Sequence, residues 1–154
     1  MNNALLHFEQ FFAETLFGIS VMVVVILFTM YTFLEILLAY RRSIEPRVSR
    51  GRHYEVLKFI AYVMLLVFAQ FLALFIWVLA LTGLELVSHW VPALLFTASF
   101  FTSVGNFTEV LPEGWGLTPS IIAFSGLFSF AWATAATMSM ARALMEQLDR
   151  HKED

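Results

Sequence analysis

Hydrophobic and charged positions are strongly segregated along this chain. Four stretches of at least 20 residues carry no Asp, Glu, Lys or Arg: residues 15–34, 59–84, 86–108 and 114–141. A helix of about 20 apolar residues crosses the hydrocarbon core of a bilayer, so each stretch is long enough to be a span. We expect transmembrane helices near 18–40, 57–83 and 120–145, with a partly interfacial helix at 3–17 ahead of the first.

The third stretch, residues 86–108, differs from the others because it contains residues that begin or end helices. Pro92 suits the first turn of a helix, and Ser88 just upstream is a possible N-cap. Glu85 and His89 are alternative residues to cap or orient this helix. The dipeptide Gly105-Asn106 is typical of a turn that ends a helix. We therefore expect only about ten residues here to be helical, which is too few for a span.

The positions of the basic residues indicate whether residues 86–108 cross the membrane or enter and leave it on one side. All nine Lys and Arg lie after the first span or at the C-terminal end: Arg41, Arg42, Arg47, Arg50, Arg52 and Lys58, then Arg142, Arg150 and Lys152. By the positive-inside rule both groups are cytoplasmic, so an even number of spans separates them. The second and third spans supply two, and 86–108 must enter and leave on the outer side. Non-helical backbone at membrane depth is tolerated only inside protein or beside water, as in a pore loop.

The chain has no internal repeat, and we treat it as one functional unit with three parts. Residues 1–56 hold the N-terminal segment, the first transmembrane helix and a basic cytoplasmic loop. Residues 57–145 form a pore module, and residues 146–154 form a cytoplasmic tail. This topology puts the N-terminus outside and the C-terminus in the cytoplasm.

Composition agrees with a membrane protein and excludes other classes. Apolar residues make up 60% of the chain, above the roughly 45–50% of soluble domains. The chain has no cysteine, its four histidines are scattered and its net charge is −3, so we expect no disulfide, no resident metal and no nucleic-acid partner. The sequence contains no nucleophile with a nearby base and no phosphate-binding glycine motif, and we expect no enzymatic activity.

Residues 93–112 resemble the pore helix and selectivity filter of potassium channels, in which Thr-Thr-Val/Leu-Gly-Tyr-Gly-Asp is followed shortly by Pro. The chain is most similar to the small bacterial three-span ion-channel family grouped with two-pore-domain potassium channels. In that family a Leu-Pro-x-x-Trp turn resembles residues 111–115, and the inner-helix run Gly-Leu-x-x-Phe-Gly-Trp-Ser-Thr-Ala resembles residues 126–135. The resemblance implies an all-α integral membrane protein of the bacterial inner (plasma) membrane, with a re-entrant pore helix and filter loop between the second and third transmembrane helices.

The resemblance also implies a site and an assembly. Five residues would form an ion-binding filter whose backbone carbonyls replace the water around a cation: Thr102, Ser103, Val104, Gly105 and Asn106. Three residues would form its outer mouth: Phe107, Thr108 and Glu109. Since one loop supplies one wall of a pore, a homotetramer in contact with membrane lipids is implied. The permeant ion would be a monovalent cation, K+ or Na+, and no cofactor is expected.

The outer half of this filter departs from the family pattern. Asn106, Phe107 and Thr108 stand where the family has Tyr, Gly and Asp. We expect a cation channel of weak or altered selectivity, with inward carbonyls in the inner half, where Gly105 can adopt a positive φ. Four phenylalanines near the axis could instead close the mouth. The alternative is therefore a non-conducting channel-like scaffold or an accessory subunit of a membrane complex.

One face of the third span carries small or weakly polar residues at helical spacing: Ser125, Ser129, Ala133, Ala136 and Met140. Such a face either lets helices approach closely or lines a narrow aqueous path. We assign five residues of this span to gating and pore lining, with tight helix packing as the alternative: Gly126, Ser129, Ala133, Ala136 and Met140.

Other polar residues have individual assignments. Five glutamates are expected on the outer surface, where they would concentrate cations: Glu9, Glu14, Glu85, Glu109 and Glu113. Glu35 is expected to snorkel to the cytoplasmic interface, to pair with Arg41 or Arg42, or to sense protons. Gln70 is expected to form an interhelical hydrogen bond. The basic segment 41–53 either binds anionic lipid headgroups or only sets the topology.

Overall fold

The computed structural model describes residues 2–44, 52–105, 111–112 and 114–153, and every regular element in these ranges is a helix. Four helices follow one another along the chain: α1 (Asn2–Ser43), α2 (Arg52–Gly83), α3 (Trp90–Phe101) and α4 (Thr118–Glu153). Four residues of the predicted filter and mouth lie outside the described residues: Asn106, Phe107, Thr108 and Glu109.

Three helices contain a segment long and apolar enough to cross a membrane: Phe11–Ser43, Arg52–Gly83 and Thr118–Asp149. The predicted all-helical fold with three membrane-spanning candidates is therefore confirmed. The first helix is longer than expected, because α1 is continuous where the sequence predicted a boundary between residues 17 and 18. The Thr15 and Ser20 hydroxyls donate to carbonyls four residues back, so neither side chain competes for the amides of the helix.

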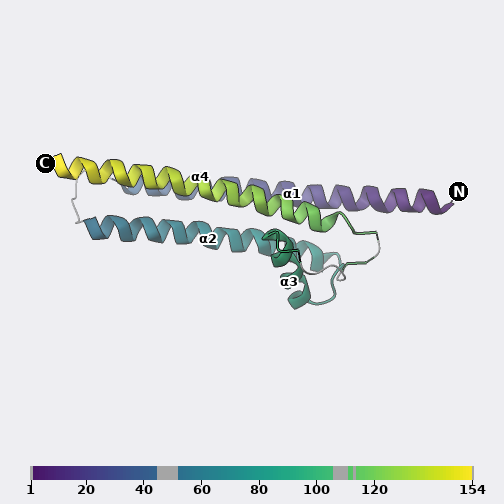
Figure 1. Cartoon of the computed structure of the whole chain (residues 1–154). Helices are drawn as coiled ribbons and strands as arrows, with labels where there is room; N and C mark the ends of the chain where they lie inside the picture. The colour runs from purple at the N-terminus through teal and green to yellow at the C-terminus, as the bar shows by residue number, and fades with distance from the viewer. Residues whose placement is uncertain (1, 45–51, 106–110, 113, 154) are drawn as a thin grey trace.

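The long helices form a bundle with α3 at one end (Figure 1). α1 and α4 lie side by side and run in the same direction, and α2 runs antiparallel to them. α4 also packs against α2 and α3, and α2 packs against α1 and α3. The chain reaches α3 from the end of α2 and leaves it toward the start of α4, at the same end of the bundle.

Buried side chains between the helices form two clusters. One surrounds Trp77 and includes Phe96 of α3 and Ile122 of α4. The other includes Phe33 and Met140 and lies toward the opposite end of α1 and α4. The outward faces of the long helices instead carry exposed large apolar side chains, among them Leu27, Leu79 and Phe124. An outer surface this apolar suits lipid rather than water.

α3 has 12 residues and begins after His89. Pro92 lies in its first turn, as predicted. The carbonyl of His89 accepts the first helical hydrogen bond, from the N–H of Ala93 at 3.2 Å, so His89 is the N-cap residue. The predicted N-cap at Ser88 is therefore wrong, and His89, the alternative cap, is confirmed.

Candidate functional site

The turn that follows α3, Thr102 to Gly105, is the part of the predicted filter that the structure describes. The N–H of Val104 donates to the carbonyl of Ser99 at 2.8 Å, and the N–H of Ser103 donates to that of Phe100 at 2.9 Å. This pattern is the Schellman motif of helix ends. Ser103 takes its left-handed position, with φ of 62°, which glycine usually occupies.

Gly105 prolongs this turn. Its φ is 70°, so the positive φ predicted from the sequence is confirmed, and its N–H also donates to the Ser99 carbonyl, at 3.2 Å. The helix itself ends at Phe101, earlier than the predicted Gly105-Asn106 turn. The amide of Thr102 still makes a helical bond, to the carbonyl of Ala98, but the amides of Ser103, Val104 and Gly105 bond back to Phe100 and Ser99 out of helical register.

In the segment Thr102 to Gly105 the backbone amides already have hydrogen-bond partners, so the carbonyl groups are the part of the backbone that is available to a ligand. All four N–H groups donate to carbonyls of residues 98–100 in α3, whereas none of the four carbonyls accepts a hydrogen bond within the described residues. The segment is exposed, and Val104 has 72% of its surface accessible. The carbonyl end of a helix dipole is negative, so these oxygens are suited to attract a cation.

The Thr102 hydroxyl belongs to the same turn. It donates to the carbonyl of Ala98 at 2.7 Å. A hydroxyl oxygen has two lone pairs as well as its proton, so this bond leaves Thr102 able to act as an acceptor or a cation ligand.

α4 approaches the end of α3 at Gly126, where there is no room for a side chain. A Cβ atom here would lie 2.8 Å from the carbonyl carbon of Phe101 and closer still to the carbonyl oxygen. Close helix packing is therefore sufficient to explain glycine at this position. A gating role for Gly126 stays a prediction.

Two buried hydrogen bonds connect α2 to α4 near α3. The indole N–H of Trp77 donates to the Ser125 hydroxyl at 2.8 Å, and the Ser129 hydroxyl donates to Oε1 of Gln70 at 2.5 Å. The interhelical hydrogen bond predicted for Gln70 is confirmed. Its Nε2 is buried and has no hydrogen-bond partner among the described residues.

The small-residue face of α4 is mostly turned toward the inside of the chain. Ser129, Ala136 and Met140 are at most 6% exposed. Ala136 and Met140 belong to the buried cluster that includes Phe33 of α1. Within one chain this burial favours the helix-packing alternative. That these residues line a pore stays a prediction.

Ala133 differs from these residues because it is only half-buried. It lines a cavity of about 230 Å³ between α2, α4 and the end of α3. Thr102 and Gln70 line the same cavity, whose walls are otherwise mainly apolar. The structure therefore brings one predicted pore-lining residue and the first filter residue together.

Glu14 has a role that the sequence analysis missed. Its side chain is 2% exposed and accepts hydrogen bonds at the start of α4. The prediction that Glu14 is an exposed carboxylate is wrong, because its oxygen accepts from the N–H groups of Leu117 and Thr118, where α4 begins. That Glu14 lies on the outer side of the membrane stays a prediction. The Thr118-Pro119 pair marks a helix start, but no pattern near Glu14 indicates that α1 provides the cap.

Glu35 does not form the predicted ion pair. It is exposed on α1 and makes no ion pair with Arg41 or Arg42. The Arg41 guanidinium instead donates to the Ser139 hydroxyl of α4 at 3.0 Å. A proton-sensing role for Glu35 stays a prediction.

Nothing in the described part of the chain resembles a metal site, since no three His, Asp or Glu side chains gather there. Comparisons with protein-family models, with curated proteins and with solved structures find no match to this chain. The fold therefore defines the class: an all-helical protein with three helices able to span a membrane.

Proposed function

We propose that this chain is one subunit of a cation channel in the bacterial inner membrane, with its N-terminus outside. Four copies would arrange the loop after α3 around a common axis, since the carbonyls of one loop form only one wall of a pore. Weak or altered selectivity is proposed because Asn106 and Phe107 replace the Tyr and Gly of the resembled filter.

One observation carries this proposal: the residues Thr102 to Gly105 are exposed, their amides are satisfied by α3, and their carbonyls accept no hydrogen bond within the described residues. A dehydrated cation needs oxygen ligands in place of water, and a ring of such carbonyls supplies them. The left-handed backbone at Ser103 and Gly105 supports the proposal, because alternating handedness turns successive carbonyls to one side.

The position of α3 is a second support. It connects at one end of the bundle to both long helices of the pore module, and it is too short to cross a membrane. A polar, non-helical segment at its end would be tolerated in a membrane only beside water or inside protein. Assembly around an aqueous axis satisfies that condition.

Planar-bilayer recording of the purified, reconstituted protein tests the proposal. We expect unitary cation currents that Gly105→Ala abolishes or alters, because alanine resists the φ of 70°. Gly116→Ala is the matched control, since this glycine has open space around it and no positive φ. Native mass spectrometry would establish that each variant forms a tetramer. A correctly assembled tetramer that is consistently silent would overturn the channel and favour the non-conducting scaffold.

The placement of the filter has its own test. The double variant Asn106→Tyr with Phe107→Gly restores the residues of the resembled pattern, and we expect it to increase selectivity for K+ over Na+. Reversal potentials under bi-ionic conditions measure this change. Unchanged selectivity in a conducting variant would show that the filter is placed wrongly.

A further inference from the structure

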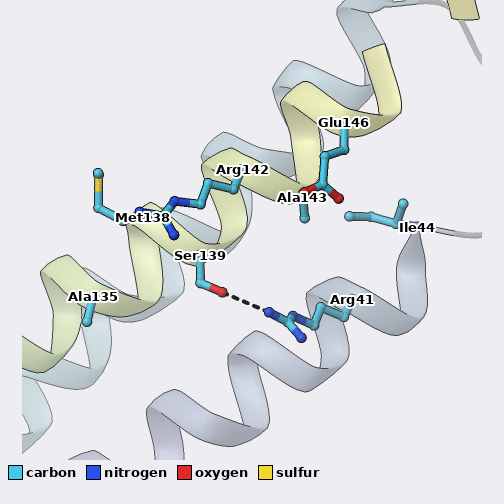
Figure 2. Close-up of a pocket in the computed structure, with 8 residues that line it drawn as sticks. All are labelled: Arg41, Ile44, Ala135, Met138, Ser139, Arg142, Ala143 and Glu146. Carbon is cyan, nitrogen blue, oxygen red and sulfur yellow. Dashed lines mark hydrogen bonds between the residues drawn. The ribbon is translucent and has the colours of Figure 1, made fainter. Parts of the chain in front are cut away.

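A cavity of about 590 Å³ lies between the C-terminal parts of α1 and α4, far from α3 (Figure 2). Eight residues line it: Arg41, Ile44, Ala135, Met138, Ser139, Arg142, Ala143 and Glu146. Since basic residues near helix ends mark the cytoplasmic side, this cavity would open at the inner surface of the membrane.

Two guanidinium groups, one from each helix, are the main polar feature of the cavity. Figure 2 shows Arg41 reaching from α1 to Ser139 on α4, with Arg142 about one turn further along α4. The Arg41–Ser139 hydrogen bond is 3.0 Å long and uses one of the five N–H donors of Arg41. Within the described residues the Arg142 guanidinium makes no hydrogen bond or ion pair. Both arginines are exposed and can donate to a ligand.

The charges around the cavity select the kind of ligand. Arg41 and Arg142 are positive and Glu146 is negative, so the lining carries one net positive charge. A phosphate diester carries one negative charge and four oxygens, and arginine donates to phosphate oxygens in a two-pronged geometry. A single-charge phosphate diester therefore matches the lining in charge and in hydrogen bonding.

The order of residues along α4 matches the order of groups in a phospholipid. Ala135 and Met138 are exposed and apolar, Ser139 and Arg142 follow, and Glu146 lies nearest the C-terminus. At about 1.5 Å per residue, Ala135 and Arg142 are separated by about 10 Å along the helix axis. Acyl chain, phosphate and headgroup would meet apolar, basic and mixed polar surfaces in turn.

We propose that this cavity binds the phosphate of an anionic glycerophospholipid, with Arg41 and Arg142 as its ligands and Met138 beside an acyl chain. The proposal is independent of the channel, because it uses only the C-terminal parts of α1 and α4, at the opposite end of the bundle from α3. Inorganic phosphate carries the same anionic group but has no apolar part to contact Ala135 and Met138. The whole lining therefore favours a lipid as the occupant.

Equilibrium binding by native mass spectrometry in a neutral detergent tests the proposal. The probes are dioleoyl-phosphatidylglycerol, dioleoyl-phosphatidylcholine and sodium phosphate. We expect phosphatidylglycerol to bind about tenfold more tightly than phosphatidylcholine, and inorganic phosphate not to displace it at equal concentration. Equal affinity for the two lipids would overturn the assignment of an anionic ligand. Displacement of phosphatidylglycerol by inorganic phosphate would show that the cavity selects the phosphate group alone and would overturn a lipid as the ligand.

Variants locate the binding to this cavity. Arg142→Ala should weaken phosphatidylglycerol binding about fivefold, and Arg142→Lys should weaken it less, because lysine keeps the charge. Arg42→Ala is the matched control: Arg42 is an exposed neighbour of Arg41 that does not line the cavity. Far-ultraviolet circular dichroism would show that the variants stay folded. Equal losses of phosphatidylglycerol affinity in Arg142→Ala and Arg42→Ala would overturn the cavity as the binding site.

Discussion

The Glu14 carboxylate of α1 accepts a hydrogen bond from the backbone N–H of Thr118, the first residue of α4, at 2.8 Å. The same oxygen accepts from the N–H of Leu117 at 2.5 Å and from the Thr118 hydroxyl at 3.2 Å. A carboxylate at a helix N-terminus satisfies amides that have no partner within the helix and complements the positive end of its dipole. Glu14 of α1 therefore caps α4, whose first residue lies 104 positions after Glu14 in the chain.

Replacing Glu14 should destabilise the protein at the junction of α1 and α4. We expect Glu14→Ala to lower the free energy of unfolding by about 1–2 kcal/mol, because the buried amides of α4 lose their acceptor. Glu9→Ala is the control, since Glu9 is exposed on the same helix. Urea or thermal unfolding in detergent micelles, followed by circular dichroism, measures both. Equal unfolding midpoints for the two variants would contradict the capping role.

A methyl group at position 126 should disturb the contact between α3 and α4. We expect Gly126→Ala to cost about 1–3 kcal/mol, because its Cβ would overlap the Phe101 carbonyl, a backbone group that cannot rotate away. Gly83→Ala has open space around it and should leave the unfolding midpoint nearly unchanged. The comparison uses the same unfolding assay. If Gly126→Ala proved as stable as Gly83→Ala, the close approach of the two helices would be refuted.

The spans could be predicted from the sequence because charge is excluded from a membrane, and that exclusion is visible residue by residue. Pro92 located the start of α3 for a similar reason, since its effect on the backbone is local. The continuity of α1 was missed because an interfacial and a spanning helix differ in their surroundings, not in their helical periodicity.

The partners of polar side chains could not be predicted where they come from distant elements. The spacing of Ser125 and Ser129 indicates one face of a helix, but not that α2 covers it. Glu14 illustrates the same limit, because its acidic character is compatible with an exposed loop and with a buried cap. Gln70 is the exception: a polar amide inside an apolar span needs a partner, and the need itself predicts the bond.

The Gln70–Ser129 hydrogen bond should be measurable by a double-mutant cycle. We expect Ser129→Ala and Gln70→Leu to show a coupling free energy between about 0.6 and about 1.7 kcal/mol, the average and the maximum for hydrogen bonds between membrane helices. Removing the serine alone leaves the Gln70 amide buried without its one partner in the described residues, whereas the double variant removes both polar groups.

The control for this cycle pairs Gln70→Leu with Thr134→Ala. Thr134 is exposed, and among the described residues its hydroxyl bonds only to its own helix, at the Phe130 carbonyl. The free-energy changes of this pair should add within about 0.5 kcal/mol. A coupling between Gln70 and Ser129 no larger than this control value would mean that the hydrogen bond contributes nothing to stability.

Introducing glycine at position 103 should stabilise the turn after α3, and removing glycine from position 105 should destabilise it. Ser103→Gly should raise the free energy of unfolding by about 0.5–1 kcal/mol, because glycine removes the cost of a left-handed serine. Gly105→Ala should lower it by about 1 kcal/mol, since it imposes that cost at a φ of 70° although there is space for the methyl group. Ser88→Gly and Gly116→Ala, at positions without a positive φ, are the matched controls and should not stabilise or destabilise in this way. Unfolding midpoints of the four variants decide the outcome, and a Ser103→Gly midpoint at or below that of Ser88→Gly would rule out the left-handed conformation at Ser103.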